Sequence, residues 1–298
     1  MPDEHDQTAH SAAAEPVDDP AGAEGPAASL PRGRRRAVGQ FVPDGVPEER
    51  GPGAYVAELL GTFMLVFVIT AAVSLYVLPA VPAGPGLPPV QPFVDFSVIG
   101  LVHVFVLFLL IQTLAAVSGA HFNPAVTIAL TAIREVKIVD AAIYIAMQLI
   151  GAVAGAFLTK ALLLDEGEGS NYGATLVNDR IGGDILPGMA VESIGTFFLV
   201  FAIVGVAVNP GGAREWSGLV IGATLGLVVM IFAPLTGAGF NPARSFGPAL
   251  ASGEFGGIVE FLLVYVVAPV VGAVLAAVLG LRLVVSHGRE RSGLRPVG

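Results

Sequence analysis

The chain has 298 residues, of which 54% are hydrophobic and only 13% are charged. Soluble domains carry about 25% charged residues, so this composition excludes an ordinary soluble domain and predicts an integral membrane protein. The formal net charge is -9 and there is no Cys, which excludes disulfides, thiolate metal sites and Cys nucleophiles.

Residues 1–50 are acidic, rich in Ala, Pro and Gly, and without a sustained apolar period. This composition predicts a disordered tail. A basic cluster within it fits a juxtamembrane anchor, which topology favours over contact with nucleic acid, so we expect no nucleic-acid partner. The cluster consists of Arg32, Arg34, Arg35 and Arg36.

Six apolar stretches between residues 51 and 285 are long enough to cross a bilayer, which takes about 20 residues. The lipid bilayer is therefore the first expected partner. Residues 286–298 form a second short tail. The predicted spans are 53–78, 96–117, 138–164, 186–208, 217–235 and 256–284.

Two further apolar segments, 118–133 and 236–252, contain near copies of one motif. In each motif an Asn can cap a helix start, and the following Pro suits the first helical position. The helices would run only about ten residues, too short to cross. A helix start at membrane depth must line a watery path or be buried in protein. We therefore predict two re-entrant half-helices, beginning at Asn123-Pro124-Ala125 and Asn241-Pro242-Ala243.

The chain also repeats a longer segment, because Glu58-Leu-Leu-Gly-Thr-Phe in the first span matches Glu192-Ser-Ile-Gly-Thr-Phe in the fourth. Repeat one covers about residues 53–164 and repeat two about 186–285. Each holds three spans, an odd number, so the second copy must be inverted relative to the first. The half-helices then enter from opposite sides, and their positive N-terminal ends meet near the midplane.

Lys and Arg in the short loops set the orientation. Nearly all of them fall on the side that holds both termini, so both termini are predicted to be cytoplasmic. Frequent Ala, Gly, Val and Arg with few Lys suggest a bacterial plasma membrane. The cytoplasmic charges outside the basic cluster are Arg50, Arg134, Lys137, Arg214, Arg282, Arg289, Arg291 and Arg295.

The doubled Asn-Pro-Ala and the paired Glu-x-x-Gly-Thr-Phe segments resemble those of the major intrinsic protein family, the aquaporins and glycerol facilitators, over about residues 53–285. The resemblance implies an all-α membrane fold with six transmembrane helices and two half-helices. It implies a channel domain at 51–285 and a homotetramer with one pore per subunit. No cofactor, no metal and no enzymatic activity are expected.

The residues of the motifs suggest how such a channel would work. Asn123 and Asn241 can cap their half-helices and still offer N–H groups to a single file of water. The two positive helix ends oppose cations and interrupt a proton wire. Arg244 follows the second motif, and an intramembrane Arg is by default functional. In the family this Arg lines the outer constriction; a structural salt bridge is the alternative.

Spacing from the motifs carries the other constriction positions of the family onto His103, Val229 and Ala238. His103 is expected to fill space and offer a hydrogen-bond donor, although it could be a buried helix-contact residue. Val229 in place of an imidazole adds room, and this pairing is similar to plant vacuolar-membrane members, some of which pass ammonia or urea. Glycerol facilitators typically carry Asp directly after the Arg that follows the second motif and a basic residue four positions later. This chain has Ser245 and Ala249 at those positions, which is similar to water channels.

Glu58 and Glu192 lie inside spans. They could carry protons in a coupled transporter, but the resemblance implies structural acceptors for the N–H groups of the re-entrant loops. The predicted function is passive water permeation with proton and ion exclusion. The nearest alternative is a neutral-solute facilitator for ammonia, urea or glycerol, and a proton-coupled secondary transporter is a more distant one.

Overall fold

The computed structural model describes residues 50–78 and 93–285. The predicted tail before residue 50, the tail after residue 285 and residues 79–92 lie outside this part. Within it, six helical stretches are long and apolar enough to cross a membrane. They are Pro52–Tyr76, Phe96–Ser118, Ile138–Leu162, Ile185–Val208, Arg214–Thr236 and Ile258–Val285, so the six predicted spans are confirmed.

The first three long helices are α1 (Pro52–Tyr76), α2 (Phe96–Ser118) and α4 (Ile138–Leu162). The first span was predicted to reach residue 78 but ends earlier. Val77–Leu78 (β1) instead pairs antiparallel with Phe93–Val94 (β2), a contact between distant segments that local hydropathy does not encode. The half-helix α3 (Pro124–Ala132) lies between α2 and α4 in the chain.

The second repeat contains the fourth span, α6 (Ile185–Ile203) with a π-helical end η3 (Val204–Val208). It continues with α7 (Ser217–Thr236) and the half-helix α8 (Pro242–Ser252). The last span is built from α9 (Ile258–Glu260), η5 (Phe261–Val267), α10 (Ala268–Gly280) and η6 (Leu281–Val285). The remaining short helices are α5 (Leu164–Glu168), η1 (Asn171–Gly173), η2 (Asp179–Ile181) and η4 (Arg214–Trp216).

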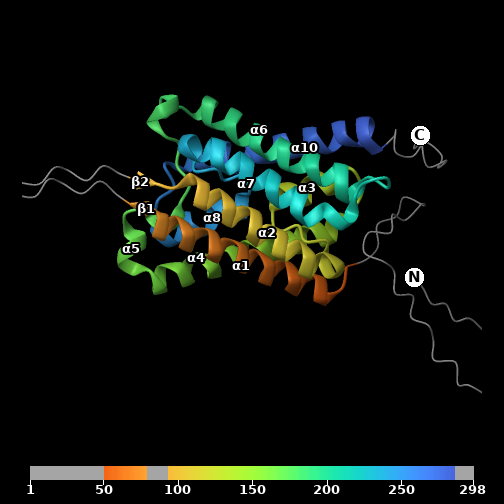
Figure 1. The fold of residues 1–298 in the computed structure, drawn as a ribbon, viewed down its shortest axis with the longest axis horizontal. Helices are drawn as coiled ribbons and strands as arrows, with labels where there is room; N and C mark the ends of the chain where they lie inside the picture. Colours follow the sequence, from red (N-terminus) through yellow and green to blue (C-terminus); the bar gives the residue numbers. More distant parts are fainter. Residues whose placement is uncertain (1–49, 79–92, 286–298) are drawn as a thin grey trace, which may run out of the picture. The chain divides into compact units, whose positions relative to one another are not determined.

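The helices pack in matching pairs, as an inverted repeat requires. The α1–α4 contact in the first half has its counterpart in α6–α10, and α1–α2 has its counterpart in α6–α7. Each half-helix crosses to the other repeat, because α3 packs against α10 and α8 packs against α4. The pair α2–α7 joins the halves, and the long helices run side by side across the view (Figure 1).

Glycines allow two of these contacts to be close. A Cβ atom on Gly155 of α4 would lie 2.6 Å from the Phe63 carbonyl oxygen of α1. A Cβ atom on Gly226 of α7 would lie 2.6 Å from the Gly100 carbonyl oxygen of α2. The small-xxx-small patterns at 151–155 and 222–226 therefore serve helix packing.

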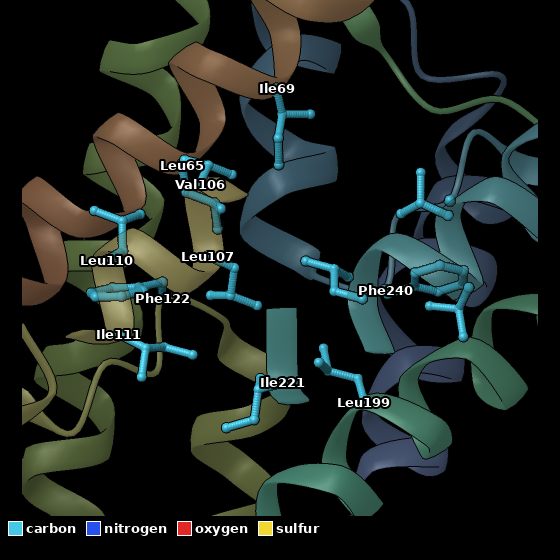
Figure 2. Close-up of a cluster of buried hydrophobic side chains, with 14 of the residues drawn as sticks. Leu65, Ile69, Val106, Leu107, Leu110, Ile111, Phe122, Leu199, Ile221 and Phe240 are labelled. Atoms are coloured by element: carbon cyan, nitrogen blue, oxygen red, sulfur yellow. The ribbon is translucent and has the colours of Figure 1, made fainter. Parts of the chain in front are cut away.

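The largest buried apolar cluster draws on α1, α2, α6, α7 and the two loops that precede the half-helices. Phe122 and Phe240, one from each loop, are completely buried in it. Figure 2 shows both rings among aliphatic side chains of the surrounding helices. The labelled aliphatic residues are Leu65, Ile69, Val106, Leu107, Leu110, Ile111, Leu199 and Ile221.

Candidate functional site

Both half-helices begin with a side-chain cap. The Oδ1 atom of Asn123 accepts a hydrogen bond from the Ala125 N–H at 2.9 Å. The Oδ1 atom of Asn241 accepts from the N–H groups of Ala243 at 3.0 Å and Arg244 at 3.2 Å. Pro124 and Pro242 are the first helical residues, where no N–H is needed. These six motif positions therefore fold alike.

The two motifs are also bonded to each other. Asn123 donates from Nδ2 to the Phe240 carbonyl oxygen at 2.9 Å, and Asn241 donates to the Phe122 carbonyl oxygen at 2.8 Å. Asn123 and Asn241 are only 4% and 6% exposed. The N-terminal ends of α3 and α8 are therefore tied together inside the protein, so their positive dipole ends face a common region.

The backbone before each motif takes the same uncommon path. Ala120 and Phe122 have φ angles of 55° and 49°, and Ala238 and Phe240 have 51° and 50°. Residues with a β-carbon pay roughly 1–2 kcal/mol each for left-handed backbone, so the surroundings must hold it in place. In both loops the partner that holds the backbone is a buried glutamate.

Glu58 of α1 accepts four hydrogen bonds. Its donors are the Ser118 hydroxyl at 2.6 Å, the N–H groups of His121 at 3.0 Å and Phe122 at 2.7 Å, and the side-chain amide of Gln148 at 2.8 Å. The side chain is fully buried. All of these groups donate toward the carboxylate, which fixes the loop before Asn123.

Glu192 of α6 has the matching role in the second repeat. It accepts from the Thr236 hydroxyl at 2.7 Å and from the N–H groups of Gly239 at 2.9 Å and Phe240 at 2.6 Å. It too is fully buried. Gln148 has no counterpart here, since Pro269 follows Tyr265 at the spacing at which Gln148 follows Tyr144.

Arg244 lies in the first turn of α8 and is 3% exposed. Its Nη1 group donates to the Gly173 carbonyl oxygen at 2.9 Å, and its Nε atom has no hydrogen-bond partner among the described residues. Gly173 ends a turn whose residues Asn171, Tyr172 and Gly173 all have positive φ angles. This loop carbonyl holds the guanidinium in place and leaves some of its donor N–H groups unused.

His103 of α2 is 2% exposed, and its Nδ1 atom lies 2.7 Å from the Ile99 carbonyl oxygen. A carbonyl only accepts, so Nδ1 carries the proton and Nε2 of the neutral ring is an acceptor. Nε2 has no partner among the described residues. In the neutral ring the one donor is therefore used by Ile99, so His103 would offer a donor to the pore only when the ring is protonated.

The remaining two predicted constriction residues, Val229 and Ala238, have apolar side chains. Val229 of α7 and Ala238 of the second motif loop are each 1% exposed. Both belong to the buried cluster that contains Phe122 and Phe240. The predicted constriction residues thus come from α2, α7, α8 and the loop that leads into α8.

Sequence reasoning missed several groups that hold the site. Tyr144 donates to the Ser118 carbonyl oxygen at 2.8 Å, and Tyr265 donates to the Thr236 carbonyl oxygen at 2.9 Å. The repetition of Ser118 and Thr236 just before the two motifs was an available signal. Gly173, by contrast, lies outside both repeated segments. Within the described residues no group of three or more His, Cys, Asp or Glu could hold a metal ion.

Comparison with known proteins points in one direction. Residues 50–279 match the family model described as Major intrinsic protein. The chain is 37% identical over 222 residues to Nodulin-26 of Glycine max, covering 74% of each protein. It is 38% identical over 225 residues to Glycerol uptake facilitator protein-like 6 of Lactiplantibacillus plantarum, covering 75% of this chain and 94% of the relative.

Two further matches lie outside plants and bacteria. Aquaporin AqpM of Methanothermobacter thermautotrophicus is 34% identical over 231 residues, which cover 74% of this chain and 93% of that protein. Among solved structures, the aquaglyceroporin from Plasmodium falciparum superimposes with a TM-score of 0.65 at 24% identity, covering 79% of this chain and 98% of that one. This structural likeness establishes the fold.

Proposed function

Since the chain belongs to the major intrinsic protein family, whose members are membrane channels for water or small neutral solutes and not enzymes, we propose that it is a passive water channel. Water would pass in single file, and protons and ions would be excluded. The observation that carries this proposal is the reciprocal bonding of Asn123 and Asn241 at the joined ends of α3 and α8.

Each side-chain amide of these two asparagines has two N–H bonds. One N–H is used by the carbonyl of the opposite loop, which leaves the second for a water molecule in the pore. Two donors and two positive helix ends at one place would turn the oxygen of that water toward the asparagines. Its hydrogens would then point outward along both halves of the file, which breaks a continuous proton wire.

The outer constriction is proposed to combine His103, Val229, Ala238 and Arg244. Arg244 supplies donors and a fixed positive charge, and His103 Nε2 supplies an acceptor. A water molecule can bond to both at once, because it donates and accepts. A cation would have to pass the guanidinium without its full hydration shell, which is costly in a buried site.

A second candidate is a facilitator for ammonia, urea or glycerol. The aliphatic Val229 favours it, because a valine side chain has no polar group and is smaller than the imidazole ring of a His at this position. Nodulin-26 and a glycerol uptake facilitator-like protein are also among the relatives. Ser245 and Ala249 favour water. A proton-coupled transporter is disfavoured, because Glu58 and Glu192 are occupied as acceptors of loop N–H groups.

The deciding experiment is stopped-flow light scattering on proteoliposomes, with protein-free vesicles of the same lipid as the control. An osmotic step in sucrose measures water flow, and inward gradients of glycerol, urea and ammonia measure solute entry. Fast shrinkage with a low activation energy and no added solute entry supports the water channel. Solute entry above the control would replace it with the second candidate, and uptake driven by a pH gradient would support a transporter.

We also propose a homotetramer in a bacterial plasma membrane with both termini in the cytoplasm. Because the chain has no Cys, single introduced cysteines can report sidedness without background. A Cys at Ser170, in the loop after α5, should react with an impermeant thiol reagent from outside. A Cys at Arg282 should react only after permeabilisation. Light scattering of the detergent-solubilised protein gives the subunit number.

A further inference from the structure

Arg50, two residues before the start of α1, is hydrogen-bonded to a distant helix through its main chain. Its N–H donates to Oδ2 of Asp140 at 3.3 Å, and its carbonyl oxygen accepts from the Tyr55 hydroxyl at 2.9 Å. The same hydroxyl lies 2.7 Å from the other oxygen of Asp140. Asp140, in the first turn of α4, is 5% exposed. The start of α1 is therefore locked against the start of α4.

The side chain of Arg50 reaches toward the first motif loop. Its Nη2 atom lies 3.8 Å from the place that a Cβ atom of Gly119 would take. The Nε2 atom of His121 lies 3.3 Å from that same point, on the loop that leads to Asn123. The guanidinium thus lies beside the junction between the end of α2 and the re-entrant loop.

Two carboxylates lie near the charge of this guanidinium, Asp140 at the Arg50 main chain and Glu58 at N–H groups of the first motif loop. The two carboxylate oxygens of Asp140 face the Arg50 main chain and the Tyr55 hydroxyl, whereas the guanidinium extends to Gly119. Of the Arg50–Asp140 pair, the guanidinium is therefore the group that reaches the loop. Gly119 has a φ angle of 90° and no side chain, so nothing of its own stands between the guanidinium and the loop backbone.

From this arrangement we infer that Arg50 is a second specificity-determining residue, a cation barrier at the end of the pore opposite Arg244. The inference rests on the proposed channel function. The positive charge raises the energy of any cation that enters the path beside residues 119–122, and the effect is electrostatic, so salt should screen it. Neutral solutes, including water, are not repelled by it. Arg244 and Arg50 would then oppose the entry of cations at the two ends of one path.

The barrier is visible only when the outer one is removed, so the test uses Arg244→Val as its background. Cation leak is measured as potassium-driven vesicle depolarisation in proteoliposomes at low salt. Adding Arg50→Gln should raise the leak roughly fivefold, the effect expected of one half-exposed charge several ångströms away. Arg50→Lys should keep the leak near the background level. Arg282→Gln, the same charge change at the exposed end of the last span, is the matched control.

Ionic strength separates a charge effect from a structural one. At about 1 M salt the screening length falls to about 3 Å, so the increase caused by Arg50→Gln should shrink toward unity. An increase that persists at high salt, or that Arg282→Gln reproduces, would overturn the inference, as would an unchanged leak. An effect that depends only on anionic lipid would show that Arg50 is a lipid anchor instead.

Water permeability of the same vesicles distinguishes two kinds of failure. If no variant and no parent protein conducts water or a neutral solute, the proposed function fails. If they conduct and Arg50→Gln leaves the cation leak unchanged, only the second barrier fails. Should Arg244→Val not assemble, Arg244→Gln removes the same charge while keeping a polar side chain that can donate to the Gly173 carbonyl, and it provides the leaky background.

Discussion

The side-chain amide of Asn123 donates a 2.9 Å hydrogen bond to the carbonyl oxygen of Phe240, the residue directly before the second Asn. Its mirror image runs from Asn241 to Phe122 at 2.8 Å. Each asparagine therefore caps its own half-helix with its oxygen and holds the other repeat with its nitrogen. One side chain fixes both the direction of a helix dipole and its distance from the opposite dipole.

Replacing Arg244 by Val should let protons and small cations through. The guanidinium is buried and held by the Gly173 carbonyl, so its charge acts at close range on anything in the constriction. Taking an effective dielectric constant of about 20 and a separation of about 6 Å, loss of one charge corresponds to a leak on the order of 100-fold higher. A pH-sensitive dye inside proteoliposomes measures it. A variant as proton-tight as the parent would contradict the role given to Arg244.

His103→Phe tests the acceptor in the constriction. The side chain stays aromatic and becomes somewhat larger, and the unpartnered Nε2 atom disappears. A water molecule beside Arg244 would lose one hydrogen bond of about 1 kcal/mol, so we expect a roughly fivefold lower water permeability per channel. Stopped-flow shrinkage, normalised to the amount of reconstituted protein, gives the value. His103→Gln, which restores a polar side chain, should recover part of it; if both variants conduct like the parent, His103 does not contact the water file.

Val229→His should narrow the pore. Val229 is almost completely buried in the cluster that also contains Ala238 and the two motif phenylalanines, so we expect a larger polar ring to take its room from the constriction. We expect any glycerol, urea or ammonia flux of the parent to fall more than its water flux. The measurement is the ratio of solute permeability to water permeability in one preparation. Because both values come from the same vesicles, differences in the amount of reconstituted protein cancel. Solute flux that survives undiminished would move the constriction elsewhere.

How much of this site the sequence predicted depends on the distance between partners. The predicted span 96–117 differs from α2 (Phe96–Ser118) by one residue, because a continuous apolar run is a local signal. The half-helix starts were equally local, since Asn-Pro encodes both cap and first residue. The Asn123–Phe240 bond joins residues 117 positions apart, and the Arg244–Gly173 bond joins residues 71 apart. No local pattern specifies such contacts.

The irregular turns were not predicted either. The last span was expected as one continuous helix, but it contains the π-helical segment η5 (Phe261–Val267). Pro269 follows at the start of α10 and has no N–H to donate to the preceding turn. A wider turn directly before it is a common way to absorb such a gap in the hydrogen-bond ladder. Hydropathy records only that the segment is apolar.

Glu192→Ala should destabilise the protein. The change leaves the N–H groups of Gly239 and Phe240 buried without an acceptor, at about 1–3 kcal/mol each. We expect a lower thermal unfolding temperature in detergent and a loss of water permeability. Glu192→Gln keeps one acceptor oxygen and should be milder. If Glu192→Gln instead assembled normally and abolished an uptake driven by a pH gradient, the glutamate would be a proton carrier.

Gly61→Ala should disturb the site from a distance. Gly61 of α1 lies directly under the Phe122 ring, and an added Cβ atom would collide with that ring; Gly195 of α6 and Phe240 repeat the arrangement. Overpacking of this kind costs about 1–3 kcal/mol, and here it also displaces the Phe122 carbonyl that holds Asn241.

The matched control for Gly61→Ala is Gly53→Ala in the same helix, where a Cβ atom meets nothing within 4 Å. Ala is the better helix former by roughly 0.5–1 kcal/mol, so this variant should be at least as stable as the parent. Thermal unfolding in detergent and water permeability are measured for both. The ring contact predicts that Gly61→Ala loses both properties together. If it loses stability but conducts normally, the position of Phe122 does not set the geometry of Asn241.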